Sequence, residues 1–529
     1  MSALRPAAAA LNAVVPPRQR PQKMAQFIFI KHEAAAALRE VLRHPQFLFL
    51  MQTAHLATPP APPERITDAD ITTAIETLLA TKKRLNAHSI TVLSREGIVE
   101  LAGVTDNLLS QQRAEEIALA VRGVRALHST LAVQTDEIGD AELQRDVAGA
   151  LADDPATDDY QVHCTVSGGV VTLAGLVQSW AEKQLVLRVL QGVRGVRAFV
   201  ADHLTIRGGE ILNSDEEITT QIRDLLDWDI RVNGALVQVR TNEQVVHLSG
   251  TVGTAVEKDR LVAISYQTGA TRVDARDLFV AYWALGREIR RDKFTPKTDE
   301  AIAGAVRETL RFNPRMRASE TLVQVYDGVV TLAGTVSNLR TKQDAEQDAR
   351  HVVGVANVHN LLKVRPVRLV SDEDIGQSIT AALSRDPYVG HCAFHVQVHG
   401  GQVLLSGYVN APFEVEQAGD VAAGVSGVVD MNNRLEVANP EAGDDFCTPV
   451  SGEETASPDQ ALAERIRQRY FWSASLHNQK VEVRVEKGRA NLSGTVDTWL
   501  DREQATLDAY EAGARDVDNS LLVSGTVGF

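Results

Sequence analysis

The chain has 529 residues, of which 44% are hydrophobic and 23% charged, a globular composition that excludes a collagen-like or wholly disordered chain. Its 54 basic and 69 acidic residues give a formal charge of −15, which argues against nucleic-acid binding along the whole length. The three cysteines are far apart and odd in number, which excludes a disulfide scaffold and a cysteine-rich metal site. Length alone predicts about three or four domains.

The first 60 residues differ from the rest of the chain in charge. They hold seven basic and two acidic side chains, a net charge of +5 that leaves −20 on the other 469 residues. The apolar runs at 27–30 and 47–51 are far shorter than the roughly 18–20 residues of a membrane span or the about 7–15 of a secretory signal. We therefore expect a basic, partly disordered tail over residues 1–66. We also expect a cytoplasmic location, with the periplasm as the alternative, and Met24 could be the true start.

A seven-residue pattern that ends on glycine recurs six times along the chain. It reads Gly-Val-Val-Thr-Leu-Ala-Gly at 169–175 and again at 328–334. The closing glycines are 72, 75, 84, 73 and 87 residues apart and are Gly103, Gly175, Gly250, Gly334, Gly407 and Gly494. Near-regular spacing of this kind indicates six copies of one structural unit.

The same elements are predicted in the same order around each copy. A helix comes first, with its apolar residues on one face as at 71–79, and it stops at signals such as Asp154-Pro155. Two strands joined by a tight turn such as Asp327-Gly328 follow, then a second helix as at 342–353 and a last strand. The sequence predicts an α+β fold of tandem α-β-β-α-β units, each a three-stranded mixed sheet with two helices on one face.

These patterns also predict the domain boundaries. Gaps of five or six residues between units 1 and 2, 2 and 3, and 4 and 5 predict that those neighbours pack side by side. A basic linker or helix is expected at 282–297, and an acidic flexible linker at 439–456 that lets the last unit move independently. The six units are placed at 67–134, 140–207, 214–281, 298–365, 371–438 and 457–524.

The units resemble BON domains, named for bacterial osmotically inducible and nodulation proteins. The resemblance rests on the first helix with its Asp-Pro end, the Gly-x-Val-x-Leu-x-Gly hairpin, and a late element seen at Gly354-Val355 and 360–364. It covers roughly residues 67–524. Unit 3 departs from the pattern at Gln244 and at Gly269-Ala270, and unit 6 at Ala490 and Gly513-Ala514.

The search for chemistry finds no catalytic or metal site. His395 and His399 lie four residues apart on a predicted strand, about 13 Å at about 3.3 Å per residue, so they cannot share an ion, and solvent-facing histidines are expected. His391 and Cys392 precede these histidines and complete a run of possible metal ligands, but no metal site is predicted there. Cys164 occupies a core position and is expected to be a small hydrophobic residue.

Acidic residues recur at the starts of the first helices, as at Asp372 and Glu373. They suit the helix dipole, and a cation site is the secondary interpretation. No nucleophile–base pair, phosphate-binding loop or dinucleotide motif is found, so no enzyme activity and no cofactor are expected.

The resemblance implies a non-enzymatic binding or scaffold protein of osmotic or envelope stress that associates with phospholipid or protein partners. One alternative is a self-assembling structural protein, and another is a small-ion or small-ligand sensor. No nucleic-acid partner is expected. The predicted membrane or partner contacts are Arg18, Arg20, Lys23, Phe27, Phe29, Lys31, Arg39, Arg43, Phe47, Phe49, Trp283, Arg287, Arg290, Arg291 and Lys293.

Overall fold

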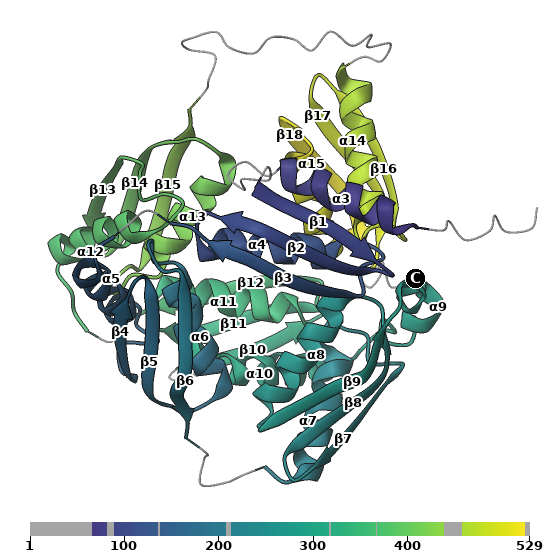
Figure 1. The fold of residues 1–529 in the computed structure, drawn as a ribbon, viewed down its shortest axis with the longest axis horizontal. Helices are drawn as coiled ribbons and strands as arrows, with labels where there is room; N and C mark the ends of the chain where they lie inside the picture. Colours follow the sequence, from purple (N-terminus) through teal and green to yellow (C-terminus); the bar gives the residue numbers. More distant parts are fainter. Residues whose placement is uncertain are drawn as a thin grey trace, which may run out of the picture. The chain divides into compact units, whose positions relative to one another are not determined.

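The computed structural model describes residues 66–81, 89–135, 138–207, 213–316, 319–366, 368–438 and 458–523. They form six separate three-stranded sheets, each with its strands in chain order and with helices on one face (Figure 1). The predicted α+β repeat is therefore confirmed. None of the described helices is both long and apolar enough to cross a bilayer.

The first three repeats have the following helices and strands. Repeat 1 has α3 (Asp68–Thr81), β1 (Ile90–Arg95), β2 (Ile98–Thr105), α4 (Leu108–Ala120) and β3 (Ala126–Val133). Repeat 2 has α5 (Asp140–Asp153), β4 (Gln161–Ser167), β5 (Val170–Val177), α6 (Trp180–Gln191) and β6 (Ala198–Ile206). Repeat 3 has α7 (Asp215–Trp228), β7 (Val237–Asn242), β8 (Val245–Val252), α8 (Ala255–Gln267) and β9 (Arg272–Val280).

Two short helices, η2 (Tyr282–Leu285) and α9 (Arg287–Arg290), lead to the second half. Repeat 4 has α10 (Asp299–Phe312), η3 (Pro314–Met316), β10 (Glu320–Tyr326), β11 (Val329–Val336), α11 (Leu339–Arg350) and β12 (Asn357–Val364). Repeat 5 has α12 (Asp372–Arg385), β13 (Phe394–His399), β14 (Gln402–Val409), α13 (Pro412–Ala423) and β15 (Asp430–Val437). Repeat 6 has α14 (Pro458–Trp472), β16 (Lys480–Glu486), β17 (Arg489–Val496), α15 (Trp499–Glu511) and β18 (Asp516–Val523).

Repeat 4 shows how the motif builds a sheet. β10 and β11 are antiparallel with Val323 opposite Leu332, and β11 and β12 are parallel. Val330 and Leu332 are completely buried against α10 and α11, because alternate strand residues point to the helix-covered face. Each of the other repeats has a core of its own built in the same way.

The closing glycine of the motif is required by close backbone approach. Gly334 has φ +130°, and a Cβ placed there would lie 1.9 Å from the carbonyl oxygen of Glu320. No side chain can be accommodated at that distance without moving a strand. The recurring glycine therefore fixes how closely the first strand lies against the second.

The acidic residue at the start of each first helix binds the hairpin turn. Asp299 accepts hydrogen bonds from the backbone amides of Asp327, at 2.8 Å, and Gly328, at 2.9 Å. The equivalent aspartate bonds the turn in all six repeats, through two backbone amides in five of them and through the amide of Gly168 alone in repeat 2: Asp68, Asp140, Asp215, Asp299, Asp372 and Asp459. These amides hold the pKa of Asp372 below its usual value, as amides bonded to a carboxylate do. The carboxylates therefore have a structural role that the helix-dipole interpretation did not include.

One backbone hydrogen bond recurs between different repeats. It runs from the residue before the late glycine of one repeat to the carbonyl that ends the first helix of another. The four cases are Arg122 to Trp472 (2.9 Å), Arg194 to Arg385 (2.7 Å), Val353 to Trp228 (2.8 Å) and Ser426 to Asp153 (3.1 Å). Repeat 1 is thus joined to repeat 6, repeat 2 to repeat 5, and repeat 3 to repeat 4. We call these pair 1·6, pair 2·5 and pair 3·4.

Each pair makes two such backbone bonds, but in two different ways. In pair 2·5 the bond is made in both directions, so the two repeats are equivalent. In pair 3·4 the second bond runs from the amide of Ile230 to the carbonyl of His351, at 3.0 Å, and in pair 1·6 from Ala474 to Ala120, at 3.3 Å. Pro155 and Pro387 stand at the position of Ile230 in repeats 2 and 5, and proline has no amide hydrogen to donate.

This pairing differs from the expectation drawn from the short gaps. Sequence neighbours do touch, as α6 and α8 or α11 and α13 show, but the backbone bonds join repeats from opposite halves of the described chain. Repeat 6 was expected to move independently; instead it is hydrogen-bonded to repeat 1. The short gaps thus indicated neighbours that do touch, but they did not indicate which repeats share backbone bonds.

Candidate functional site: an arginine-lined cavity between repeats

Most of the predicted contact residues lie outside the described part of the chain. These are Arg18, Arg20, Lys23, Phe27, Phe29, Lys31, Arg39, Arg43, Phe47 and Phe49, together with the side chain of Arg287. Of the others, Trp283 is 56% exposed and the Arg291 side chain 73% exposed. Both are placed on the surface, where a partner could reach them.

Arg290 and Lys293 point inward instead. Arg290 donates to the buried carboxylate of Glu257 at 2.7 Å. The ammonium group of Lys293 donates to the carbonyls of Leu226, at 2.7 Å, and Asp229, at 2.5 Å, and also to that of Val232. Burial lowers the pKa of Lys293 to about 8. These two residues therefore anchor the linker to repeat 3. The basic helix that was expected in this linker is α9, which is only four residues long.

A set of charged side chains surrounds a cavity of about 420 Å³ where repeats 2, 3 and 4 meet. Its walls come from α6, α8, α11 and the ends of α7 and α10. We call it the arginine cavity after its lining guanidinium groups, which belong to Arg188, Arg231, Arg260, Arg315 and Arg340. Its volume falls in the range of roughly 300–1,000 Å³ usual for small-molecule sites.

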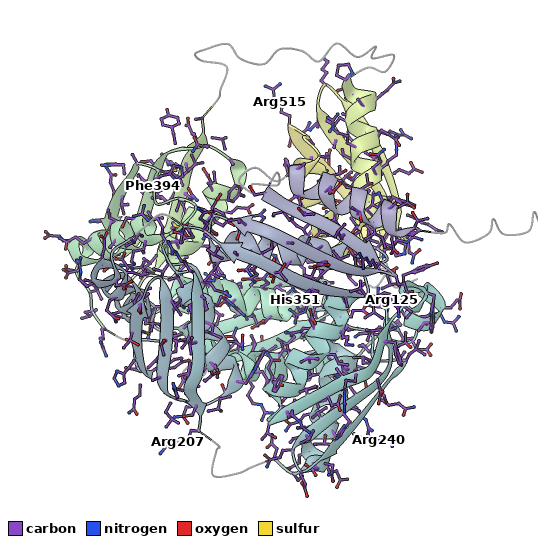
Figure 2. All side chains as sticks on the ribbon, viewed as in Figure 1. Arg125, Arg207, Arg240, His351, Phe394 and Arg515 are labelled. Carbon is purple, nitrogen blue, oxygen red and sulfur yellow. The ribbon has the colours of Figure 1, made fainter. Side chains whose placement is uncertain are left out.

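Asp229 is the central carboxylate on one side of the arginine cavity. It accepts two hydrogen bonds from Arg231, at 2.8 and 2.7 Å, and a third from Arg260, at 2.9 Å. Its side chain is only 9% exposed, and these guanidinium groups hold its pKa well below the usual range. His351, labelled in Figure 2, lies nearby at the end of α11, and burial lowers its pKa to about 3, so it is neutral.

On the other side, Arg315 joins two repeats. It makes a bidentate pair with Asp154 of repeat 2, at 2.8 and 2.6 Å, and also lies 3.2 Å from Asp344. Arg340 lies 3.0 Å from Asp344 and 2.9 Å from Asp420 of repeat 5. Bidentate guanidinium–carboxylate pairs fix orientation as well as adding energy, so these contacts hold repeats 2, 4 and 5 in register.

Arg188 differs from the other four arginines. Within the part of the chain that the structure describes, its side chain makes no ion pair or hydrogen bond. The side chain is exposed, yet surrounding protein and the nearby Arg315 and Arg340 lower its pKa. The exposure of Arg188 and its lowered pKa are both explained by a guanidinium group that faces the water-filled cavity. It also lines a smaller adjoining cavity of about 290 Å³, as do Arg315 and Arg340.

Asp348 is the cavity carboxylate that no arginine of the described chain pairs with directly. It accepts a hydrogen bond from the side-chain amide of Asn313 at 2.6 Å. Burial is the main reason that its pKa rises to about 6, with a further contribution from Asp344. An aromatic pair closes the rim, because Trp180 stacks on Tyr266 with ring centroids 5.7 Å apart.

The arginine cavity could not be found from sequence spacing. Its charged residues come from five helices or helix ends in three repeats, and neither the arginines nor the aspartates form a motif. Chemically, it offers guanidinium groups, side-chain amides and one aromatic face in a partly enclosed space. That set suits a small anion and contains no nucleophile beside a base.

The outcome for the remaining predicted residues is mixed. His395 and His399 are both exposed on β13, as expected of solvent-facing histidines. Cys164 is half-buried, and burial raises its pKa to about 11, so its thiol is unreactive. Cys447 lies outside the described residues.

The fold and the repeat motif together define a tandem array of one small α+β module. The BON domain family matches residues 67–135, 139–208, 214–275, 298–366, 371–439 and 458–525, and the chain belongs to this family. Osmotically-inducible protein Y of Escherichia coli (strain K12) is 31% identical over 144 residues, 26% of this chain and 71% of that protein. An uncharacterized protein of the gshII 5′ region of Anaplasma centrale is 27% identical over 134 residues, 23% of this chain and 89% of that protein.

Two solved structures show a weak likeness to this chain. The C-terminal domain of CdsD, a type III secretion structural protein of Chlamydia trachomatis, covers 41% of this chain and 96% of its own at 14% identity, with a TM-score of 0.11. The periplasmic domain of PrgH covers 39% and 95% at 13% identity, with a TM-score of 0.10. Scores this low carry no argument about this chain.

Proposed function

We propose that this chain is a non-enzymatic binding and scaffold protein of bacterial osmotic or envelope stress. The observation that carries the proposal is the pairing of repeats, which joins the six BON domains in three pairs by backbone bonds. Paired repeats present their outward sheet faces in a fixed arrangement, which suits a scaffold better than loosely strung modules would. The likeness to an osmotically inducible protein supports the stress context.

The partner that we favour is a membrane surface rich in anionic phospholipid. Residues beyond position 60 carry −20 and would be repelled by it, so the basic tail is the contact, assisted by the exposed Trp283 and Arg291. This proposal places the protein in the cytoplasm, with the periplasm as the alternative that fractionation would reveal.

Vesicle sedimentation tests the membrane proposal. The full chain should sediment with phosphatidylglycerol-containing vesicles and less with phosphatidylcholine alone, and added salt should release it. A chain that starts at residue 64 keeps the compact unit that begins at Ile66 and should bind less. Equal binding by both chains would contradict the role of the tail, and no binding by either would contradict the membrane partner.

A second candidate function is sensing of a small anion, favoured by Arg188 in the arginine cavity. Inorganic phosphate should raise the melting temperature of the full chain, because a ligand that binds only the folded state stabilises it. Arg188→Ala should abolish the shift, whereas Arg207→Ala, at an exposed arginine labelled in Figure 2, should keep it. A shift that survives in Arg188→Ala would rule out this site.

Self-assembly is favoured by the outward sheet face of repeat 4. Leu322 of β10 and Leu361 of β12 flank Ala333 of the central strand and are 57% and 61% exposed. Tyr326, on the same face of β10, is 77% exposed. Exposed apolar sheet faces of this kind are typical of interaction surfaces. Light scattering should show association that rises with concentration and is lost in Leu322→Glu; a monomer at all concentrations would contradict self-assembly.

A further inference from the structure

Repeat 5 contains the one cluster of metal-ligand side chains found among the residues that the structure describes. His391 and Cys392 lie between α12 and β13, just before Phe394 (labelled in Figure 2), and Glu414 lies in the first turn of α13. One ligand atom from each of these three residues lies within 4.8 Å of the other two. The two histidines considered from the sequence, His395 and His399, are not part of it.

The spacing of Cys392 and His391 fits two ligands of one tetrahedral ion. The thiol sulfur of Cys392 lies 3.3 Å from Nε2 of His391. Zinc–sulfur and zinc–nitrogen bonds of about 2.3 and about 2.0 Å, at a tetrahedral angle, separate such atoms by about 3.5 Å. The side-chain amide of Asn410 lies 3.1 Å from the same Nε2, so its oxygen could supply a fourth ligand after rotation of the amide.

Glu414 is placed by the fold before any metal arrives. It is completely buried, and its Oε2 accepts a hydrogen bond from the backbone amide of Asn410 at 2.7 Å. Glu182 and Glu257 make the same bond, at 2.6 and 2.8 Å, in repeats 2 and 3. The structural bond uses Oε2, and in the proposed site Oε1 is the metal ligand.

Repeat 6 shows what the same position does without metal ligands. Gln479 stands where Cys392 stands, and Asp497 where Asn410 stands. The two are joined by hydrogen bonds, from the Gln479 amide to the carboxylate at 3.2 Å and from the Asp497 backbone amide to the Gln479 oxygen at 3.1 Å. A cross-link between these two segments is thus part of the module, and repeat 5 makes it from a thiol, an imidazole and a carboxylate.

We propose that His391, Cys392 and Glu414 bind one divalent transition-metal ion of the zinc class, with Asn410 or water as the fourth ligand. A thiolate and a carboxylate balance the charge of the ion, and neutral imidazole completes a donor set that prefers zinc or cobalt to magnesium or calcium. The ion clips the segment after α12 to the start of α13 and adds its binding energy to the stability of repeat 5.

Cobalt titration of the full chain, freed of metal with a chelator, tests the proposal. Co²⁺ should bind with one equivalent that gives thiolate charge-transfer absorption, and Zn²⁺ should displace it. Cys392→Ser should abolish this absorption, and His391→Gln and Glu414→Gln should weaken binding at least tenfold. Glutamine at 414 keeps an oxygen for the Asn410 amide, so this variant preserves the structural bond.

Matched controls separate the site from adventitious binding. Cys164→Ser, Cys447→Ser and His395→Gln change the same residue types elsewhere and should leave the absorption and the affinity unchanged. Absence of thiolate absorption in the folded wild-type chain would overturn the proposal. Unchanged absorption in folded Cys392→Ser would overturn it as well.

Discussion

Pair 2·5 and pair 3·4 use the same helix ends to join two repeats, but they join them differently. In pair 2·5 each repeat donates once, from Arg194 and from Ser426. In pair 3·4, Val353 of repeat 4 donates to Trp228, and Ile230, just after the first helix of repeat 3, donates to His351. The corresponding amide of repeat 3, that of Thr268, bonds to Ile264 in its own helix.

The difference follows from two local sequence features. Repeats 1, 2, 4 and 5 have Gly-Val after the second helix and donate from the residue before that glycine. Repeats 3 and 6 have Gly-Ala, and their second helices run to two residues before the glycine, so the amide stays inside the helix. These two repeats lack proline after the first helix and donate from there instead. Each of the three pairs therefore keeps two backbone bonds, although the residues that donate them differ.

Asp229→Ala should have the largest effect, and it acts inside repeat 3 of pair 3·4. Arg231 and Arg260, which are 26% and 27% exposed, lose their shared buried carboxylate, so we expect a loss at the low end of the about 3–5 kcal/mol seen for broken buried pairs. Urea unfolding should show a large fall in the midpoint. Asp227→Ala, at an exposed position two residues earlier, should change the stability by less than about 0.5 kcal/mol. Equal effects of the two variants would show that these ion pairs do not stabilise repeat 3.

Asp348→Asn should reduce the pH dependence of the stability of the folded chain. With a folded pKa of about 6 against 3.8, the folded chain holds the extra proton between about pH 4 and pH 6, so stability falls as pH rises through that window. Asparagine removes the buried charge and should raise stability by about 1–2 kcal/mol at pH 8 and by little at pH 4. Part of the slope should remain, because Asp501 also has a pKa of about 6. Melting curves at several pH values check this, and an unchanged slope would contradict it.

Arg385→Ala should have the smallest effect, in pair 2·5. Arg385 contacts Asp153 at 2.5 Å, but that carboxylate is 27% exposed and both backbone bonds remain. We expect a loss of about 1 kcal/mol in urea unfolding, as for partly exposed ion pairs. A double-mutant cycle with Asp153→Ala isolates the coupling between the two side chains. A loss as large as that of Asp229→Ala would mean that side chains, not backbone bonds, hold pair 2·5.

The repeat unit could be predicted from sequence because its signals are local. Glycine at 334, helix periodicity at 71–79 and the turn at 327–328 each act within one module. The role of Asp299 was open to prediction too, since an acidic residue precedes each turn by a constant 28 or 29 residues.

Contacts between repeats were harder to predict because no single repeat contains both partners. The substitutions at Gly269-Ala270 and Gly513-Ala514 were visible as departures from the family pattern. Their effect on pairing could not be predicted from sequence, because it depends on which carbonyl of the partner repeat lies beside the amide. The proposed metal site was missed for a different reason: its residues share one repeat, but Glu414 is more than twenty residues from His391 and reaches it only through the fold.

Hydrogen exchange tests the pairing of repeats most directly. The amides of Arg122, Arg194, Val353 and Ser426 should all be protected in the full chain, because each donates to another repeat. Deletion of residues 439–529 removes repeat 6 and with it Trp472, the acceptor for Arg122. The pairing account predicts that Arg122 alone becomes rapidly exchanging while the other three stay protected. Unchanged protection of Arg122 in the shortened chain would contradict it.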